Sequence, residues 1–326
     1  MPKRVSMCTR WDRAQDVRGM GDESTQVRRP VPLPAELGQA FSVSAALDIG
    51  VGRDRLRARD VTRHFTGGRV VQVALTTLDL ARALSVLLEP EQYFSHLTAA
   101  EFNGMRLPEG RRPTILHVTY ENAHRAMRRP DVVGHKTKHP VPVIEFADGL
   151  RVSNPVAAWT ECSSILSVDD LVAMGDGLVR RKAPQATLED LARTVAAHAG
   201  RRGAARLRAA LPHIRPETDS ARETRLRLAV ARSGFPEPTV NGPLVDRRGA
   251  QIARGDLVFE SFGVVLEYEG RQHADDPHQF AIDIRRLDEI AEAGYRVIRV
   301  DRVLLARPDI LHRKIHTALT ERGWHP

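Results

Sequence analysis

The sequence predicts an α/β (α+β multidomain) protein, and three observations support this. The chain has 326 residues, enough for two or three domains. Hydrophobic residues make up 42% of it and aromatic residues only 5%, so aliphatic side chains must fill its cores. Segments of helical period alternate with short apolar runs that are typical of strands. We expect boundaries that give the segments 1–34, 35–76, 77–215 and 216–326.

The charge balance and the cysteines limit the class of protein. Lys and Arg number 49 against 41 Asp and Glu, a net charge of +8, which suits a polyanionic partner or simply reflects plentiful arginine. Cys8 and Cys162 lack CxxC spacing, as in the reducing cytoplasm. No apolar run approaches the ~20 residues that span a bilayer, so we expect a cytoplasmic protein without a membrane partner.

The N-terminal residues predict a tail followed by a small nucleic-acid-binding unit. Residues 1–34 have no regular period, and we expect a disordered basic tail. In 35–76, Ser42 is placed to cap a helix over 43–49, which Gly50 ends. A second short helix with Leu56 inward and a strand, tight turn and strand over 65–71 complete the order of a winged helix-turn-helix. The arginines expected to contact nucleic acid are Arg53, Arg55, Arg57, Arg59 and Arg69. The alternative is a small helical cap whose arginines face solvent.

Residues 77–215 predict a mainly helical middle domain that links the other two. Helices are expected over 78–87, 97–102, 154–166, 169–179, 188–199 and 204–211. Strands are expected over 114–119 and 141–146. The histidines His96, His117, His135 and His139 are scattered without ligand spacing, and we interpret each as a core or surface residue. We therefore expect no catalytic site in this domain.

The C-terminal segment predicts the order α-β-β-α-β-α, a mixed sheet with helices on its faces. Expected strands cover 253–260, 263–269 and 296–300, and expected helices begin at Ser220, Asp276 and Ile310. Asp256 lies in the first strand, and Glu267 and Glu269 lie two apart in the second, so both leave the same face. Carboxylates among apolar strand residues are costly unless a cation neutralises them. Either these groups bind Mg²⁺ (or Mn²⁺), or the glutamates face solvent at a sheet edge.

A longer pattern carries a resemblance. Residues 256–273 read DLVFESFGVVLEYEGRQH, followed by Asp283 to Arg286 and then by Ala293 to Val300. This pattern resembles the domain of unknown function 559, which belongs with the very-short-patch-repair-like endonucleases of the PD-(D/E)xK superfamily. The resemblance covers about 110 residues and implies a restriction-endonuclease-like domain over 216–326. The region ahead of it is similar to the winged helix of AbiEi-type antitoxins.

The resemblance also implies roles for individual residues. Asp256 and Glu267 would be metal ligands, with the Tyr268 carbonyl as a further oxygen. Glu269 stands where the superfamily has lysine, a departure that bears on activity. Gln272 and His273 match the family's loop, with His273 as a general acid or base. Two positions stay open: Glu223 is a functional acid or half of a capping box, and Arg286 binds phosphate or pairs with Asp283 or Asp288.

The expected function is therefore a DNA-binding protein with a Mg²⁺-dependent endonuclease domain that hydrolyses phosphodiester bonds. The alternative is a non-catalytic antitoxin-type transcriptional regulator with a degenerate nuclease fold and a toxin partner. Asp256, Glu267, Gln272 and His273 together favour the enzyme, and the absence of lysine at position 269 favours the regulator. The sequence does not choose between DNA and RNA, nor does it give the target sequence or the oligomeric state.

Overall fold

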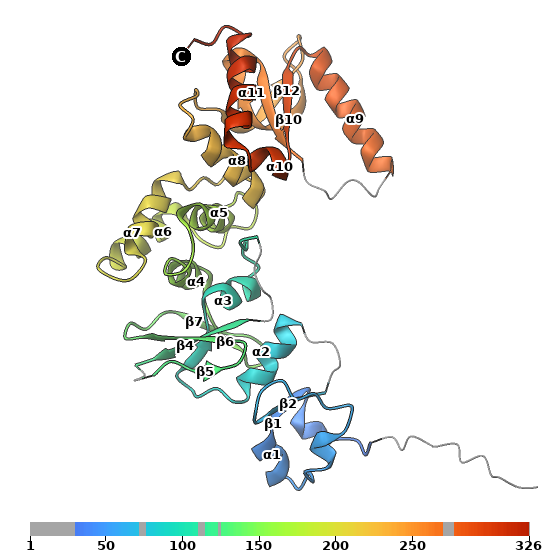
Figure 1. Ribbon diagram of the computed structural model, residues 1–326, viewed down its shortest axis with the longest axis vertical. Helices are drawn as coiled ribbons and strands as arrows, with labels where there is room; N and C mark the ends of the chain where they lie inside the picture. Colours follow the sequence, from blue (N-terminus) through green and yellow to red (C-terminus); the bar gives the residue numbers. More distant parts are fainter. Residues whose placement is uncertain (1–29, 72–75, 110–114, 123–124, 270–276, 326) are drawn as a thin grey trace, which may run out of the picture.

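A computed structural model describes residues 30–71, 76–109, 115–122, 125–269 and 277–325, with the backbone alone over 277–284. It is a mixed α and β structure with three sheets. Figure 1 shows an elongated molecule, with a small N-terminal unit at one end, a central sheet with helices beside it, and the C-terminal domain at the other end. The tail expected over 1–34 lies outside the described residues except for its last five.

The N-terminal unit forms around one short helix and a pair of short strands. Its elements are β1 (Ala40–Ser42), α1 (Val43–Asp48), a 3-10 turn (Arg55–Arg57) and β2 (Gly68–Val70). Ser42 caps α1 as expected, because its Oγ accepts a hydrogen bond from the Ala45 amide at 3.0 Å. Gly50, with a φ of +85°, follows the helix. Leu37, Phe41, Ala46, Val51, Leu56 and Val61 form the core.

Two expectations for this unit need correction. The second helix is only the 3-10 turn, because Ala58 already has extended backbone and ends it after three residues. The hairpin over 65–71 forms only in part. Its tight turn is present, since the Gly68 amide donates to the Phe65 carbonyl at 3.1 Å, but β2 pairs with β1 and has only an isolated bridge, between Val70 and Thr62, across the turn.

The described part of the central domain combines six α-helices with a six-stranded mixed sheet, which has more strands than the two that the sequence predicts. The sheet has the order β5-β6-β4-β3-β8-β7. Its strands are β3 (Gln92–Phe94), β4 (Leu116–Glu121), β5 (Arg128–Arg129), β6 (Val132–Thr137), β7 (Val143–Glu145) and β8 (Arg151–Ser153). Only β4 and β7 were expected, because β3, β5 and β8 are short and β6 has no regular apolar alternation.

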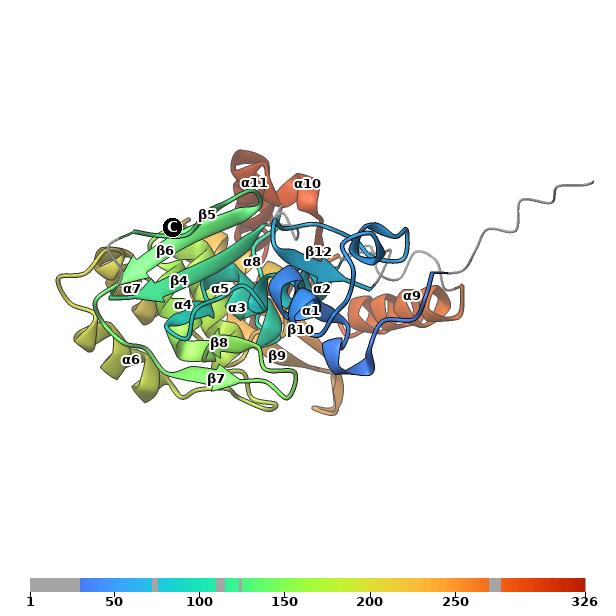
Figure 2. The ribbon, with the colours of Figure 1, turned by 90° about the horizontal axis from the view of Figure 1, so that it is seen from below.

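The helices of the central domain occur where the sequence predicts them. They are α2 (Thr77–Ser85), α3 (His96–Phe102), α4 (Pro155–Cys162), α5 (Val168–Leu178), α6 (Leu188–Ala197) and α7 (Ala204–Ala210). Helices α3 and α4 lie on the side of the sheet that faces the C-terminal domain, and the view from below has the strands in front of them (Figures 1 and 2). Trp159 of α4 is fully buried and donates its Nε1 hydrogen to the Leu171 carbonyl at 2.9 Å, which joins α4 to α5.

A fully buried carboxylate joins the central domain to the C-terminal domain. Asp176 of α5 accepts hydrogen bonds from Arg227 Nη2 at 3.0 Å and from Thr224 Oγ1 at 2.7 Å, both on α8 (Ala221–Ala231). It also accepts from the Arg215 amide at 2.7 Å and from Thr218 Oγ1 at 3.0 Å. Each of its partners lies on the chain segment that leads into α8 or on α8 itself, so the two domains are fixed to each other here.

The C-terminal domain has a four-stranded sheet in the order β12-β11-β10-β9. After α8 come β9 (Thr239–Val245), β10 (Gln251–Phe259), β11 (Val264–Tyr268), α9 (Pro277–Glu292), β12 (Arg296–Val300), α10 (Arg302–Leu305) and α11 (Pro308–Thr320). The expected strands are present, with β9 added at the edge. Gly263, with a φ of +58°, makes the turn into β11.

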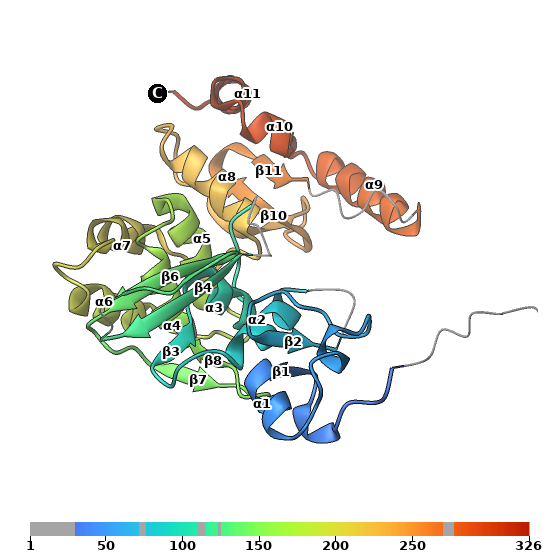
Figure 3. The ribbon, with the colours of Figure 1, turned by 60° about the horizontal axis from the view of Figure 1, so that its bottom comes forward.

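Helices cover both faces of this sheet. Leu226 of α8 and Ile315 of α11 pack with Leu257 and Leu266 on one face. Ile290 of α9 packs with Val258, Val265 and Leu244 on the other. The ribbon has α8 and α11 on one side of the strands and α9 on the opposite side (Figures 1 and 3). Asp256 and Glu267 share the face of α9, because each lies two residues from a side chain that packs there.

Candidate functional site

Asp256 and Glu267 lie opposite each other on adjacent antiparallel strands. The β10–β11 ladder pairs Leu257 with Leu266, so the next pair outward is Asp256 with Glu267. Asp256 Oδ2 accepts a hydrogen bond from the Tyr268 amide at 2.6 Å. The Glu267 side chain is buried. The expected acidic pair is therefore present, at the end of the ladder.

Burial makes this pair hold protons unusually well. The pKa of Asp256 is raised to about 6. Desolvation is the main cause and the charge of Glu223 contributes, while the hydrogen bond from the Tyr268 amide acts in the opposite direction. Desolvation and then the charge of Asp256 raise the pKa of Glu267 to about 7, against the opposing effect of Arg286. Two desolvated carboxylates with too little positive charge around them provide oxygen ligands that favour a bound cation.

Arg286 of α9 is the cation that contacts this pair. Its Nη2 donates to Glu267 Oε1 at 3.1 Å and to the Arg254 carbonyl at 2.6 Å. Both partners lie on the sheet, so the alternative of an ion pair with Asp288 on its own helix is not what the described residues have, while the side chain of Asp283 lies outside them. Arg286 thus places a positive charge at the acidic pair.

Glu269 lies apart from the acidic pair. Its carboxylate forms an ion pair with Arg299 Nε of β12, and its amide donates to the Val300 carbonyl at 2.8 Å. Among the described residues, Asp256, Glu267 and Glu269 do not form a group whose ligand atoms all lie within 4.8 Å of one another. The expectation of three clustered carboxylates was therefore wrong, because the parallel strand β12 supplies Glu269 with its own cation.

Glu223 lies in the first turn of α8, and its charge acts on the acidic pair. Ser220 Oγ accepts from the Glu223 amide at 3.2 Å, while Glu223 Oε2 accepts from the Asp219 amide at 2.7 Å and from Asn241 Nδ2 at 3.4 Å. Its charge raises the pKa of both Asp256 and Glu267. Only the Ser220 half of the capping box is therefore present, because the Glu223 carboxylate contacts the Asp219 amide and not that of Ser220, and the functional role of Glu223 stays a prediction.

The remaining expected site residues of this domain divide into two kinds. Gln272 and His273 lie outside the described residues. Tyr268 contributes its amide to Asp256, and its ring lies under the Arg222 guanidinium at 5.7 Å. The proposed role of its carbonyl as a metal ligand stays a prediction.

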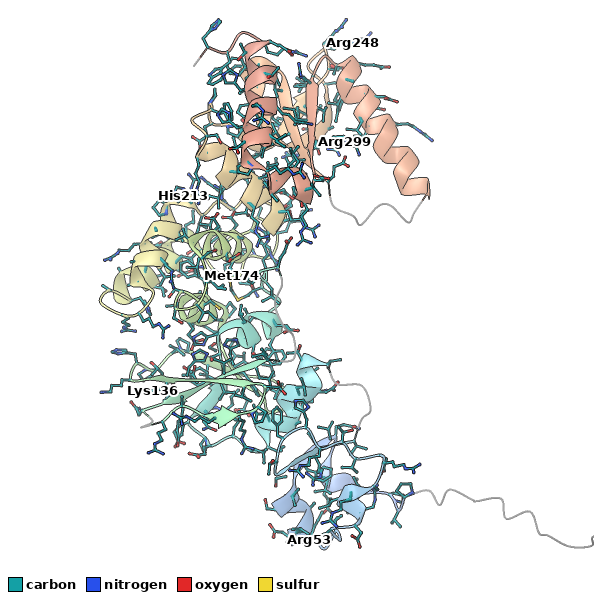
Figure 4. The ribbon with its side chains drawn as sticks, viewed as in Figure 1. Arg53, Lys136, Met174, His213, Arg248 and Arg299 are labelled. Carbon is teal, nitrogen blue, oxygen red and sulfur yellow. The ribbon has the colours of Figure 1, made fainter. Side chains whose placement is uncertain are left out.

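The arginines of the N-terminal unit differ in how free they are. Arg55 is bound to Asp60 through two hydrogen bonds, of 2.9 and 2.6 Å, and to the Val31 carbonyl. Arg69 donates to the carbonyls of Leu56 and Gly68 at 3.0 and 2.7 Å. These two therefore hold the unit together. Arg53, Arg57 and Arg59 are exposed, and Figure 4 labels Arg53 at the end of the molecule remote from Arg299.

Three histidines that the sequence left scattered lie together in the central domain. His96 begins α3, His117 is on β4 and His135 is on β6. One ligand atom from each lies within 4.8 Å of the other two, and they are the only such group of three or more in the described part of the chain. Their proximity was not predicted from the sequence, while the interpretation of each as a core or surface residue stays a prediction. The parallel pairing of β4 with β6 brings them together, and recognising β6 would have been needed to foresee it.

The histidine rings are stacked, and the two that show shifted pKa values are uncharged at neutral pH. The centroids of His96 and His135 lie 3.6 Å apart at 14°, and His117 Nδ1 lies 2.9 Å from His135 Nε2. Burial lowers the pKa of His96 well below its usual value, and the neighbouring His135 and His117 add to this. Burial lowers the pKa of His135 to about 4, with help from Arg202.

These histidines open into a cleft of about 1310 Å³. His96 and His135 line it together with Glu161 and Ser164. Exposed cationic side chains line it as well: Lys136, Lys138, Arg193, Arg201 and Arg202. Desolvation raises the pKa of Glu161 to about 7, although Glu161 Oε2 accepts hydrogen bonds from Ser153 Oγ at 2.7 Å and from the His96 amide at 3.1 Å.

Comparison with known proteins gives no match for this chain: no family model, no curated protein and no solved structure. Along the described ranges, every helix falls short of the length and apolarity that crossing a bilayer demands.

Proposed function

We propose that this chain is a DNA-binding protein whose C-terminal domain is a metal-dependent endonuclease of the restriction-endonuclease-like fold. The observation that supports this most is the position of Asp256 opposite Glu267, both desolvated, at the end of the β10–β11 ladder. Buried carboxylates with raised pKa values concentrate at functional sites. The four-stranded mixed sheet with helices on both faces agrees with the fold that the resemblance implies.

The acidic pair suits a hard divalent cation. Asp256 and Glu267 supply only oxygen, and their raised pKa values indicate that their negative charge lacks compensation. When bound, Mg²⁺ or Mn²⁺ would activate a water molecule and stabilise the charge that develops on a phosphate. Asp256 and Glu267 would hold the ion. Arg286, beside Glu267, would bind the phosphate.

The N-terminal unit would hold the nucleic acid. Arg53, Arg57 and Arg59 are exposed within a few residues of one another, as contacts to phosphate require. A winged helix-turn-helix is a less direct fit, because its second helix would be the single 3-10 turn over Arg55–Arg57. Backbone contacts without base readout are therefore the binding mode that we favour.

One observation favours the alternative of a non-catalytic antitoxin-type regulator with a toxin partner. Glu269 stands at the position of the superfamily's lysine. Its carboxylate forms an ion pair with Arg299 and so does not join the acidic pair. A degenerate nuclease fold that binds DNA without cutting it would look like this.

Cleavage of supercoiled plasmid decides between the two. The purified protein with Mg²⁺ or Mn²⁺ should nick the plasmid, and Asp256→Asn and Glu267→Gln should not. Asp288→Asn is the matched control, since it removes an exposed carboxylate from α9 and should leave nicking unchanged. If supercoiled, linear, single-stranded and RNA substrates all stay intact with both metals, the regulator is the better description.

A further inference from the structure

The central domain contains a second site that is independent of the acidic pair. We propose that His96, His117 and His135 bind a divalent transition-metal ion, with Zn²⁺ as the best fit, and that its remaining coordination position opens into the basic cleft. Nitrogen ligands from three separate segments meet there: His96 at the start of α3, His117 on β4 and His135 on β6.

The sheet itself brings two of the three ligands together. In the parallel β4–β6 ladder, His135 pairs with Thr119, and His117 lies two residues before Thr119. His117 and His135 therefore leave the same face of neighbouring strands. The Ser95 amide donates to the His117 carbonyl at 3.0 Å, which holds the third histidine over these two. Ligands fixed by backbone pairing are preorganised, as a metal site requires.

His96 is held in an unusual conformation. Its φ is +50°, in the left-handed region that residues other than glycine seldom adopt. The Glu161 carboxylate accepts a hydrogen bond from the His96 amide at 3.1 Å, and Ser153 Oγ in turn donates to Glu161 at 2.7 Å. Backbone strain that neighbouring groups maintain is typical of functional sites. Here it directs an imidazole toward two others.

The donor chemistry selects the kind of metal. Three imidazoles suit Zn²⁺ and its neighbours in the transition series and do not suit Mg²⁺ or Ca²⁺. A metal requires the neutral form of histidine. Ser95 Oγ lies 2.9 Å from His96 Nδ1 and is placed to orient the ring, while Nε2 has only a longer contact of 3.5 Å with Ser164 Oγ and is the nitrogen that a metal would take.

The spacing of the nitrogens is close to what a tetrahedral ion needs. His117 Nδ1 and His135 Nε2 are 2.9 Å apart, whereas two nitrogens on tetrahedral Zn²⁺ are roughly 3.3 Å apart, given bond lengths of about 2.0–2.1 Å. The two nitrogens would therefore have to move apart by only a few tenths of an ångström to bind the same ion. Without metal, the same two atoms share a hydrogen bond, which is the competing interpretation of the cluster.

Three protein ligands leave a fourth position on the ion, the arrangement of sites that keep a water or a substrate atom. His96 and His135 line the cleft, so this position faces open space. The same cleft is lined by Lys136, Lys138, Arg201 and Arg202 and by Arg193, which pairs with Asp190. Figure 4 labels Lys136, which lies on β6 of the central sheet. An anion, and inorganic phosphate as the simplest probe, is therefore the ligand class that the cleft favours.

Metal binding to the full chain, stripped with a chelator and free of any affinity tag, tests the proposal. Titration calorimetry with Zn²⁺ should give one tight equivalent, and Co²⁺ should give the intense visible absorption of tetrahedral nitrogen coordination. His117→Gln and His135→Gln should each weaken Zn²⁺ binding by more than roughly 10–100-fold, which is the cost of losing a group that only hydrogen-bonds to a metal ligand. Inorganic phosphate should change the Co²⁺ spectrum of the wild type.

Two controls make the result specific. His139→Gln and His198→Gln remove histidines of the same cleft that do not belong to the group, and both should bind Zn²⁺ as the wild type does. Asp256→Asn should also keep the Zn²⁺ site, which separates it from the acidic pair. Circular dichroism shows whether each variant is folded. The proposal is overturned if folded His117→Gln or His135→Gln binds Zn²⁺ like the wild type, or if the wild type binds none. The stacked rings are then a neutral core cluster.

Discussion

The backbone amide of Tyr268 donates a hydrogen bond to Asp256 Oδ2 across 2.6 Å. The β10–β11 ladder has ended by this point, so the carboxylate takes the place of the carbonyl that a continuing strand would offer. An asparagine side chain keeps an oxygen for this amide but carries no charge. Asp256→Asn therefore separates the structural role of Asp256 from its electrostatic one.

The first prediction concerns the stability of Asp256→Asn as a function of pH. Folding raises the pKa of Asp256 from 3.8 to about 6 and that of Glu267 from 4.5 to about 7. A raised pKa adds stability at low pH that is lost as pH rises through the folded value, so this contribution should fall between about pH 4 and 7. Without metal, the free energy of unfolding of Asp256→Asn should exceed that of the wild type at pH 8 by at most about 3 kcal/mol. The two proteins should be equally stable at pH 4.

Thermal melts in metal-free buffer across this pH range measure the effect. Asp288→Asn should follow the wild-type curve at every pH, because its carboxylate is exposed. A variant that melts below the wild type at both ends of the range would mean that the charge on Asp256 stabilises the fold instead of destabilising it.

A second prediction concerns stabilisation by Mg²⁺, and it rests on the proposed function. An ion that binds only the folded chain raises its free energy of unfolding, by about 2.7 kcal/mol at a concentration 100 times the dissociation constant. Mg²⁺ should therefore raise the melting temperature of the wild type and have much less effect on Asp256→Asn or Glu267→Gln. An equal shift in all three proteins would assign the ion to some other site.

The third prediction concerns the salt dependence of duplex binding. Each phosphate contact adds about 0.9 to the slope of log affinity against log salt. Because Arg53 and Arg59 are exposed, Arg53→Ala with Arg59→Ala should lower that slope by up to about 1.8 for two such contacts. Lys182→Ala, which removes one positive charge from an exposed loop of the central domain, should not change it. The slope is measured by fluorescence anisotropy at several salt concentrations.

Arg55→Ala should behave differently from its neighbours. Arg55 joins the turn to Asp60 and to the Val31 carbonyl, so its loss should lower the melting temperature of the N-terminal unit. The salt slope should stay the same. A slope that falls with Arg55→Ala as far as with Arg53→Ala would show that the ion pair with Asp60 opens when nucleic acid binds.

The fourth prediction concerns the buried ion pair between Asp176 and Arg227. Asp176→Asn leaves the Arg227 guanidinium without its counter-charge, and removal of one partner of a buried pair costs about 3–5 kcal/mol. Asp169→Asn breaks the exposed pair with Arg232 between the same two helices and should cost less than about 1 kcal/mol. Urea unfolding measures both. Similar midpoints for the two variants would mean that water reaches Asp176.

The C-terminal domain could be predicted in large part because its signals are local. Apolar strands flank a turn at Gly263, and a helix that Gly294 ends precedes β12, whose predicted bounds Arg296–Val300 agree with the structure. The tight turn between the two strands also placed Asp256 of β10 within reach of Glu267, and alternation along the second strand placed Glu267 and Glu269 on one face. Local alternation cannot give the neighbour on the far side, however, and Arg299 of the parallel strand β12 takes Glu269 away from the pair.

The central sheet and its histidines could not be predicted for the same reason. β6 contains Gly134, His135 and Lys136 and has no apolar alternation to mark it as a strand. Its partner β4 is joined to it in parallel, so no hairpin turn connects them. The three histidines are separated by about twenty residues each, which matches no known ligand spacing, and only the pairing of the strands brings them together.

The Asp176 joint has a consequence for where a bound duplex could be cut. Arg53 lies at the far end of the elongated molecule from the C-terminal domain (Figures 1 and 4), and that domain is anchored to α5 through a charge that no solvent reaches. On the proposed function, the scissile bond would then lie at a constant distance in space from the stretch of DNA that the arginines bind. Straight and pre-bent duplexes of equal length should therefore be cut at different positions.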